Sequence, residues 1–437
     1  MDVAVYNQRT DPDDDALLDR IQREAAAYVL NEFSADNGLV MDRTQPDAPC
    51  SIAAVGLTLS SYPVVAERGW LPRPEAARRA ATTLRFFERS PQGPEPDAAG
   101  YHGFYYHFLD MKTGRRAPRS ELSTIDTALL LAGALTAAGY FGGDTADERD
   151  IRRIAEVLYA RVEWPWAQTR GAAISHGWRP RRGFLPYDWT GYNEALIVYA
   201  LALGSPTHPV HADAYAAWTS TYKWKRIYGH EYLYAGPLFI HQLTHAWVDF
   251  RDLQDEYMRR RHSDYFENSR RATLVHQQYG VRNPRGWEGY GATTWGITAS
   301  DGPGPGVRTV RDRSRRFYGY RARGVPFGPD DGTLAPWAVA SSLPFAPEIV
   351  LPTLRHFDQL ELRSGKRYGF RATFNSTYPS GGEHPAGWVS PWYFGLNQGP
   401  VILMIENFRS GLIWRLIRDS PHIARGLRRA GFTGGWL

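Results

Sequence analysis

Two segments of this chain are apolar on every side over lengths typical of helices. Residues 125–135 read Ile-Asp-Thr-Ala-Leu-Leu-Leu-Ala-Gly-Ala-Leu, and residues 195–203 contain only Ala, Leu, Ile, Val and Tyr. A helix that is apolar all round has no face for water, so it belongs inside a protein or a membrane. Both runs are shorter than the roughly 18 to 20 apolar residues that span a bilayer. The sequence therefore predicts helices buried at the centre of the fold and no membrane partner.

Other segments, such as residues 252–261, have the spacing of amphipathic helices, which predicts an outer layer around the buried one. We expect about thirteen helices, near residues 14–33, 50–68, 73–89, 122–141, 147–161, 192–203, 209–221, 235–248, 252–279, 333–342, 346–359, 399–417 and 419–429. An inner ring of helices wrapped by an outer ring places the wholly apolar helices inside and the amphipathic helices outside. We therefore predict an all-α fold, a single (α/α)6 toroid over residues 1–437.

Long loops are expected to line a substrate groove at one mouth of this barrel. They correspond to the Pro/Gly-rich stretches at residues 91–99, 302–306, 324–332 and 378–387. Residues 101–108 alternate with strand character and predict a short hairpin over the same groove.

The amino-acid composition limits the kinds of partner that this protein can bind. Aromatic residues make up 14% of the chain and include 15 tryptophans, more than a core needs, so exposed rings in a groove are expected. The formal net charge is only +5, and the arginines are scattered without a long basic tract, which argues against a nucleic-acid partner. A single cysteine, Cys50, excludes an internal disulfide.

The N-terminal residues 1–6 lack the basic and apolar regions of a secretory signal. We therefore expect a soluble protein, cytoplasmic as the sequence stands, or periplasmic or secreted if a leader has been removed. No cofactor is implied, and nothing in the sequence fixes the oligomeric state.

Residues 185–194 combine aromatic rings with acids immediately before a buried run. The rings are those of Tyr187, Trp189 and Tyr192, and the carboxylates are those of Asp188 and Glu194. Sugars need this pairing, because aromatic faces cover their C–H surfaces while carboxylates bond hydroxyls and exchange protons with the glycosidic oxygen. The segment predicts a site that cleaves an oligo- or polysaccharide.

Glu194 is the predicted proton donor. It is expected in the first turn of its helix, where the helix dipole lowers a carboxyl pKa, so the surrounding rings would have to raise it by desolvation. Its candidate partners are Asp126, Glu121 and Asp301. Asp126 ends the sequence Ser-Thr-Ile-Asp, which is also a capping box, so capping and catalysis stay equal alternatives. Glu121 precedes the same helix and is expected to be more exposed.

Asp301 lies in an Asp-Gly-Pro sequence that is typical of an ordinary turn. Three aromatic residues, Trp287, Tyr290 and Trp295, are expected to crowd this turn, so a sugar contact is an equal alternative. The predicted stacking walls of the site are formed by Trp178, Tyr187, Trp189, Trp287 and Trp295.

Two further groups of residues have two interpretations each. Asp42 and Arg43 form either a clamp on sugar hydroxyls or a surface salt bridge. His241, His245 and Asp249 share a helical face, and two histidines at this spacing can hold zinc. No HExxH glutamate accompanies them, so core or sugar-bonding histidines are favoured and no metal is predicted.

Several motifs can be compared with known families. They include Asn-Gly-Leu-Val-Met-Asp-Arg at 37–43, Tyr-Asn-Glu-Ala-Leu at 192–196, Gly-Trp-Glu-Gly-Tyr-Gly at 286–291, Ala-Ser-Asp-Gly-Pro at 299–303 and Gln-Gly-Pro at 398–400. Together they resemble the bacterial glucoamylase-like domain family, which includes β-1,2-glucanases and domains of cyclic β-1,2-glucan synthases. The resemblance extends from about residue 20 to residue 436.

The resemblance implies an (α/α)6 barrel, a catalytic acid at Glu194 and a second acidic position at Asp126. Asn397 and Gln398, at the Gln-Gly-Pro motif, are predicted to bind sugar. Glucanases of the family often carry an acid at the position of Ser123, glutamate at that of Asp126 and aspartate at that of Asn397. Because those positions can supply a water-activating base, their replacement here predicts transfer to sugar acceptors beside hydrolysis.

These observations predict a glycoside hydrolase or transglycosylase that acts on β-1,2-linked glucan. Two alternatives stay open. The protein is either a glycosidase for another glycan or a non-catalytic glycan-binding protein of the same fold.

Overall fold

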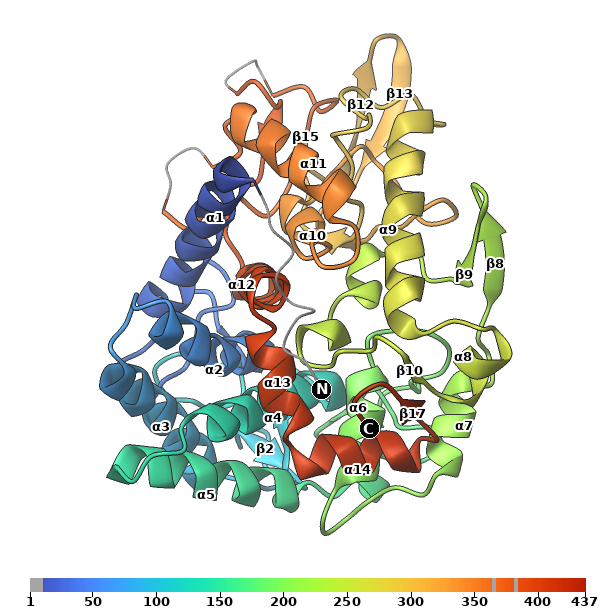
Figure 1. The fold of residues 1–437 in the computed structure, drawn as a ribbon. Coiled ribbons are helices and arrows are strands. Elements are labelled where there is room, and N and C mark those ends of the chain that lie inside the picture. The colour runs from blue at the N-terminus through green and yellow to red at the C-terminus, as the bar shows by residue number, and fades with distance from the viewer. Residues whose placement is uncertain (1–10, 364–366, 381–383) are drawn as a thin grey trace.

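The computed structural model describes residues 11–363, 367–380 and 384–437 and has a predominantly helical fold (Figure 1). Its α-helices are α1 (Pro12–Asn31), α2 (Ile52–Glu67), α3 (Arg73–Arg89), α4 (Thr124–Tyr140), α5 (Ala146–Arg161), α6 (Leu196–Gly204), α7 (Asp213–Thr219), α8 (Glu256–Arg260), α9 (Tyr265–Arg282), α10 (Pro336–Ala340), α11 (Pro347–Gln359), α12 (Gly395–Arg409), α13 (Leu412–Arg418) and α14 (Pro421–Arg429). Three 3-10 helices join them, η1 (Trp164–Ala167), η2 (Leu238–His241) and η3 (Thr244–Ala246). The predictions made from residues 1–6 and for part of the loop at 378–387 fall outside the described residues.

The centre of the fold is formed by α2, α4, α6 and α12. Every residue of α6 is buried, as is every residue of α2 from Ile52 to Val65. Close approach of α2 to α4 depends on Gly56, because a Cβ there would lie 2.2 Å from the carbonyl oxygen of Leu129. The apolar runs at 125–135 and 195–203 belong to α4 and α6, so the prediction of centrally buried helices is confirmed.

An outer layer of helices packs on this centre. The amphipathic helix α3 buries one side only, at Ala76, Ala77, Ala80, Ala81, Thr83, Leu84 and Phe87. It packs on α2 and α5, while α1 packs on α12 and α14 packs on α6. Figure 1 shows α12 near the middle of the molecule with α1, α3, α5 and α14 around it. Among the described helices, none combines the length and the apolar character that crossing a membrane requires.

The strands are short and lie between the helices. One antiparallel sheet contains, in order, β2 (Gly100–Tyr101), β3 (Phe104–Tyr106), β5 (Leu122–Ser123), β6 (Gly177–Arg179) and β7 (Gly183–Phe184). The other strands form two-stranded antiparallel pairs: β1 (Cys50–Ser51) with β4 (Phe108–Leu109), β8 (Trp224–Ile227) with β9 (His230–Leu233), β10 (Leu253–Gln254) with β17 (Thr433–Gly434), β11 (Ala299–Ser300) with β14 (Arg321–Ala322), β12 (Gly306–Val310) with β13 (Arg313–Phe317), and β15 (Phe374–Asn375) with β16 (Trp388–Val389). The pairs β1–β4 and β3–β5 tie the segment at 101–108 to the starts of α2 and α4.

Three of the predicted helices are replaced or divided in the structure. Residues 235–248 form only η2 and η3, because the amides of Leu238 and Phe239 donate to Ile297 and Thr298 outside the segment. The predicted helix at 252–279 is divided into α8 and α9 near His262, whose φ is +50°. The predicted helix at 399–417 is divided into α12 and α13 by a glycine at position 411 with a φ of +66°.

Candidate active site

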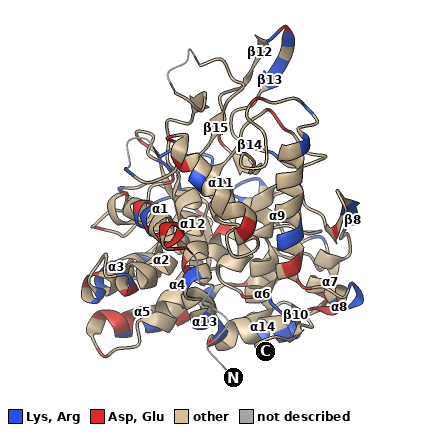
Figure 2. Ribbon diagram, turned by 45° about the horizontal axis from the view of Figure 1, so that its top comes forward, with Lys and Arg blue, Asp and Glu red and all other residues tan. Residues whose placement is uncertain are grey.

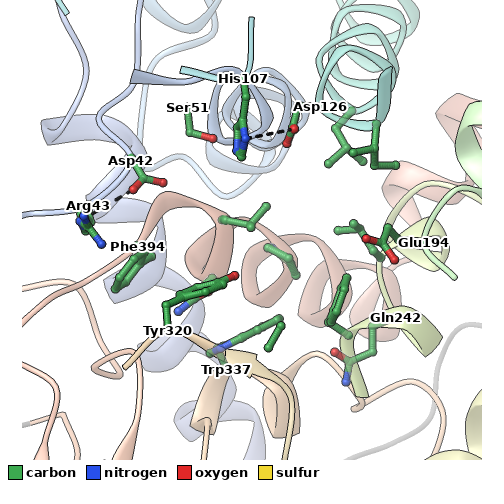
Figure 3. Close-up of a pocket in the computed structure, with 18 of the residues that line it drawn as sticks. Asp42, Arg43, Ser51, His107, Asp126, Glu194, Gln242, Tyr320, Trp337 and Phe394 are labelled. Atoms are coloured by element: carbon green, nitrogen blue, oxygen red, sulfur yellow. Dashed lines mark ion pairs between the residues drawn. The ribbon is translucent and has the colours of Figure 1, made fainter. Parts of the chain in front are cut away.

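A cavity of about 470 Å³ lies where the starts of α2, α4 and α12 meet the turn before α6 (Figure 3). Its polar lining consists of Asp42, Arg43, Ser51, His107, Asp126, Glu194, Gln242 and Asn397. Its apolar lining consists of Phe108, Ile125, Leu129, Phe239, Leu243, Ala299, Tyr320, Trp337, Phe394, Leu396 and Pro400. The volume and the mainly apolar walls with a few polar groups are typical of a small-molecule site.

Glu194 lies in a turn that precedes α6. The neighbouring Asn193 fixes this turn, because its side-chain oxygen accepts hydrogen bonds from the amide of Ala195 at 3.0 Å and from Trp218 Nε1 at 3.1 Å. Burial raises the pKa of Glu194 to about 7, opposed by a backbone hydrogen bond and reinforced by the charge of Asp126. The expectation that Glu194 lies in the first helical turn is therefore wrong, since α6 begins two residues later.

Asp126 takes part in the cap of α4 and also lines the cavity, where a catalytic role stays a prediction. Its amide donates to Ser123 Oγ at 3.2 Å, and the Ser123 hydroxyl donates to Asp126 Oδ2 at 2.5 Å. The same carboxylate lines the cavity and is paired with His107, whose Nδ1 lies 3.7 Å from Asp126 Oδ2. The cap therefore holds the carboxylate at the cavity wall.

His107 connects the carboxylates on one side of the cavity and was not identified from the sequence. Its Nδ1 lies 3.1 Å from Glu121 Oε1, and its backbone amide donates to the Glu121 carbonyl at 2.9 Å. Burial alone would lower the pKa of His107, but the charges of Asp126, Glu121 and Asp42 and the hydrogen bond to Glu121 raise it to about 9. The imidazole is therefore positively charged at neutral pH.

Glu121 and Asp301 stand next to the cavity without lining it. Burial would raise the pKa of Glu121, but the hydrogen bond and charge of His107 and the charge of Arg179 lower it. Glu121 is more exposed than Asp126, as predicted. Asp301 Oδ2 accepts a hydrogen bond from Ser390 Oγ at 2.9 Å.

Asp42 and Arg43 both line the cavity, where a clamp on sugar hydroxyls stays a prediction. Arg43 Nε lies 3.9 Å from Asp42 Oδ2, and the guanidinium lies 5.5 Å from the ring centroid of Phe394. Burial raises the pKa of Asp42, opposed by the charges of Arg43 and His107 and reinforced by Asp126. In Figure 3 this pair lies across the cavity from Glu194.

Three of the predicted stacking rings are buried, and the prediction is wrong for them. Trp189, Trp287 and Trp295 are 6%, 5% and 1% exposed. Their indole nitrogens donate to Thr124 Oγ1, Asp330 Oδ2 and Thr353 Oγ1, respectively. A ring buried in this way has no free face for a sugar. Trp287 and Tyr290 both bond Asp330, so they do not gather on Asp301 as expected.

The other predicted aromatic residues also lie outside the cavity lining. Trp178 packs against Tyr101 and Trp166, and Tyr192 packs against His241. Tyr187 is 63% exposed elsewhere on the surface, where a sugar contact stays a prediction.

The rings that line the cavity are those of Phe108, Phe239, Tyr320, Trp337 and Phe394. Tyr320 lines the cavity and is 61% exposed to solvent. Desolvation at the cavity, together with the charges of four nearby carboxylates, raises the pKa of Tyr320 to about 12. The four carboxylates are those of Asp42, Glu194, Asp126 and Asp301. These rings come from segments far apart in the sequence, so no local pattern identified them.

Three buried polar atoms of cavity residues have no hydrogen-bond partner among the described residues. They are Arg43 Nε, Gln242 Oε1 and Trp337 Nε1. Buried polar atoms without partners are unfavourable.

Asn397 and Gln398, at the start of the Gln-Gly-Pro motif, lie in different surroundings. Asn397 lines the cavity at the start of α12, whereas Gln398 donates from Nε2 to the carbonyl of Phe370 at 3.2 Å. Gln398 is 2% exposed and absent from the lining, so the predicted direct contact with sugar is not supported.

His241 and His245 lie in the core, at 0% and 2% exposure. His241 Nε2 lies 3.2 Å from the carbonyl of Ala235, and His245 Nε2 lies 3.0 Å from Ser269 Oγ. Burial is the main reason that their pKa values fall to about 4 and about 3. Among the described residues, no group of three His, Cys, Asp or Glu side chains is arranged to hold a metal ion.

The chain is similar to proteins of one family. The family model Glycoamylase, described as "Putative glucoamylase", matches residues 186–421, which is more than half of the chain. A solved structure from Bacteroides uniformis with the same description is 31% identical, with a TM-score of 0.86 and coverage of 98% of this chain and 100% of that one. This chain belongs to the glucoamylase-like family.

Two further relatives have named activities. An exo β-1,2-glucooligosaccharide sophorohydrolase from Parabacteroides distasonis is 28% identical over 95% of this chain. The chain spans 58% of the length of that curated relative. An endo-β-1,2-glucanase from Chitinophaga pinensis, solved with sophorotriose and glucose, is 26% identical, with a TM-score of 0.84 and coverage of 97% of this chain and 99% of that one.

Proposed function

We propose that this protein is a glycoside hydrolase or transglycosylase that acts on β-1,2-linked glucan, with Glu194 as its proton donor. The observation that carries the proposal is a carboxyl with a pKa of about 7 in an aromatic-lined cavity. A general acid must keep its proton near neutral pH, and burial gives Glu194 that property. The similarity to a sophorohydrolase and an endo-β-1,2-glucanase supports the choice of linkage.

In the proposed reaction, Glu194 gives its proton to the glycosidic oxygen as the bond from that oxygen to C1 breaks. The leaving chain departs as an alcohol. A water molecule, or a sugar hydroxyl in a transfer reaction, then bonds to C1 and gives its proton to a carboxylate. Solvent restores the proton of Glu194 and removes the proton from the carboxylate.

Asp126 is the preferred carboxylate for this second role. It lines the cavity, and its ion pair with His107 stabilises its negative charge. Glu121 shares the positive charge of His107 but lies behind it, and Asp301 is bonded to Ser390. These two acids therefore rank after Asp126.

We also propose that the chain forms a single catalytic domain with the closed (α/α)6 arrangement. The buried inner helices with amphipathic neighbours support this arrangement. One hydrophobic cluster runs from Leu17 to Phe432 and supports a single domain. The similarity in fold over almost the whole chain is a further argument.

The test compares linear β-1,2-glucan with β-1,3-glucan and starch as substrates of the purified protein. We expect short β-1,2-linked products from the first substrate only, detected by chromatography. Glu194→Gln removes the transferable proton while keeping the shape of the side chain, so turnover should fall by roughly 10²- to 10⁴-fold. Glu256→Gln, an exposed change on α8, is the matched control and should leave turnover unaltered.

Three results would contradict parts of this proposal. Products from starch or β-1,3-glucan instead of β-1,2-glucan would contradict the linkage. Near-normal turnover of folded Glu194→Gln would exclude Glu194 as the acid. Binding of β-1,2-glucan without new reducing ends or altered chain lengths would identify a glycan-binding protein.

A further inference from the structure

A second cavity lies between the β12–β13 hairpin and the loop that follows α9. Its volume is about 280 Å³, and it is lined by Gly286, Glu288, Val310, Arg311, Arg313, Arg315 and Thr377. The hairpin projects from the top of the molecule in Figure 1, and Figure 2 shows basic residues along it. None of the lining residues belongs to the catalytic cavity.

The hairpin concentrates positive charge. Residues 306–317 contain five arginines and one acidic residue, Asp312, which gives this segment a formal charge of +4. The whole chain has a formal net charge of +5. A charge this local indicates a negatively charged partner at the hairpin.

Strand register places two of the arginines on the face that lines the cavity. Arg313 pairs with Val310 and Arg315 pairs with Arg308, and side chains two residues apart in a strand share a face. Phe317 is on this face and is 1% exposed, so the face turns toward the body of the protein.

The guanidinium groups of Arg313 and Arg315 approach the same point. Arg315 is fixed, because it donates to the carbonyls of Arg285 at 2.8 Å and Gly286 at 2.9 Å, and it lies 4.2 Å from the ring centroid of Trp287. A Cβ at Gly286 would lie 3.8 Å from Arg313 Nη1 and 3.9 Å from Arg315 Nη2. Like charges this close repel each other, so an anion between them is stabilised.

The carboxylate of Glu288 offsets only part of the positive charge in the cavity. Glu288 Oε1 lies 3.0 Å from Arg311 Nε. In the described parts of the chain, neither Arg313 nor Arg315 forms an ion pair with a carboxylate. The three arginines and Glu288 therefore leave an excess of two positive charges around one small cavity.

We propose that this cavity binds a phosphate group, either as free phosphate or as a phosphate monoester of a small molecule. Three arginines present more N–H donors than the two oxygens of a carboxylate can accept, whereas a phosphate monoester has three strong acceptor oxygens and a charge near −2. The cavity is several times larger than the roughly 30 Å³ that one water occupies, so it admits the phosphoryl group with part of its carrier.

One chain segment connects the proposed phosphate site with the catalytic cavity. Arg315, which lines the phosphate site, precedes Tyr320, which lines the catalytic cavity, by five residues. Five residues span at most about 18 Å of chain. The phosphate site nevertheless stands on its own residues and does not depend on the proposed glucan chemistry.

The test is isothermal titration calorimetry of the full chain with inorganic phosphate and with glucose 6-phosphate, at a constant ionic strength of about 0.15 M. Arg313→Gln should weaken phosphate binding by roughly 10- to 100-fold, because it removes a charged donor from the cavity. Arg316→Gln is the matched control, since it removes the same charge from the same hairpin at a residue outside the lining, and should change affinity less than about twofold. Glu288→Gln should strengthen binding.

The outcomes separate this proposal from its alternatives. Tighter binding of glucose 6-phosphate supports a phosphate monoester as ligand, and equal binding supports free phosphate. Equal losses in Arg313→Gln and Arg316→Gln would overturn the proposal, because they would indicate diffuse surface charge. Binding to phosphatidylglycerol vesicles that excess phosphate does not displace would also overturn it, in favour of a membrane surface. Glu194→Gln should leave phosphate binding unchanged, so failure here is distinguishable from failure of the proposed catalytic role.

Discussion

The two sides of the catalytic cavity hold acids in opposite electrostatic surroundings. On one side, burial raises the pKa of Glu194 to about 7, and the nearby charge of Asp126 adds to the rise. On the other side, Asp126 and Glu121 share His107, whose pKa is raised to about 9 by its carboxylate neighbours. A proton is thus retained on the first side and negative charge is stabilised on the second, which is the difference that acid/base glycoside chemistry uses.

The backbone explains why the two sides differ. Glu194 lies in a turn fixed by Asn193, so it does not occupy the helix start that would favour its ionised form. Asp126 is placed inside the first turn of α4, and its carboxylate accepts a hydrogen bond from Ser123 Oγ. The two carboxyls are therefore placed by different backbone features, Glu194 by the turn before α6 and Asp126 by the first turn of α4.

The largest expected effect comes from removing the charge of Asp126. Asp126→Asn keeps the shape of the side chain but cannot accept a proton, so turnover should fall by roughly 10²- to 10⁴-fold if Asp126 is the base. The measurement is the initial rate of product formation from linear β-1,2-glucan. Circular dichroism checks that α4 still forms without the carboxylate.

Two conservative changes are controls for Asp126→Asn. Glu121→Gln and Asp301→Asn remove the other candidate carboxylates, and we expect losses of about tenfold or less because neither lines the cavity. A larger loss in either control than in Asp126→Asn would transfer the role of base to that residue.

A smaller effect is expected when the positive charge between the carboxylates is removed. His107→Gln keeps a hydrogen-bond donor, and turnover at neutral pH should fall by about tenfold. The alkaline limb of kcat/KM against pH, which we assign to Glu194, should stay near pH 7 in this variant. Turnover equal to that of the unmodified protein would show that His107 does not act on the base.

The stability of His107→Gln gives an independent check. Because the folded-state pKa of His107 is raised from 6.5 to about 9, the charged imidazole stabilises the fold below about pH 6.5, and this contribution disappears as the pH rises through 9. The variant should therefore melt at a lower temperature than the unmodified protein at pH 6 and at a similar temperature at pH 10.

Predictions from the sequence succeeded for features that depend on residues close together in the chain. Apolar runs identified α4 and α6, and the acids at Glu194 and Asp126 were found next to them. It failed for the aromatic walls, because Trp295 and Trp337 are indistinguishable as residue types, although one bonds Thr353 in the core and the other lines the cavity. Tertiary packing makes that distinction.

His107 was missed for the same reason. Its segment was recognised as a hairpin, but its neighbours Glu121 and Asp126 reach it only through the pairing of β3 with β5. A histidine between two strands carries no local signal of the carboxylates across the sheet. The helix expected at 235–248 failed because its amides bond residues near position 298.

Replacement of Glu194 should raise the stability of the fold, whereas replacement of His107 lowers it. The folded-state pKa of Glu194 is raised from 4.5 to about 7, so its contribution to stability is present below about pH 4.5 and is lost as the pH rises through 7. Gln cannot ionise and avoids that loss. Glu194→Gln should match the unmodified protein in melting temperature at pH 4 and exceed it by several degrees at pH 8, from a difference of roughly 3 kcal/mol at most. Equal melting temperatures at pH 8 would show that ionisation of Glu194 does not destabilise the folded protein.

The smallest expected effect concerns the fate of the sugar after bond cleavage. Asp126 is shorter than the glutamate expected at its position, and Asn397, which lines the cavity, cannot act as a base. Weaker activation of water at these two places would favour attack on C1 by a hydroxyl of a second sugar bound in the cavity. We expect a minor fraction of transfer products beside hydrolysis when sophorose or glucose is added as acceptor. Nuclear magnetic resonance of the first product gives its anomer, and chromatography gives the transfer products. Asn397→Asp supplies a carboxylate in the cavity and should reduce transfer relative to hydrolysis. If the unmodified protein forms only inverted product and no transfer product at high acceptor concentration, the expected transfer reaction does not occur. The shorter Asp126 is then sufficient to activate water for hydrolysis.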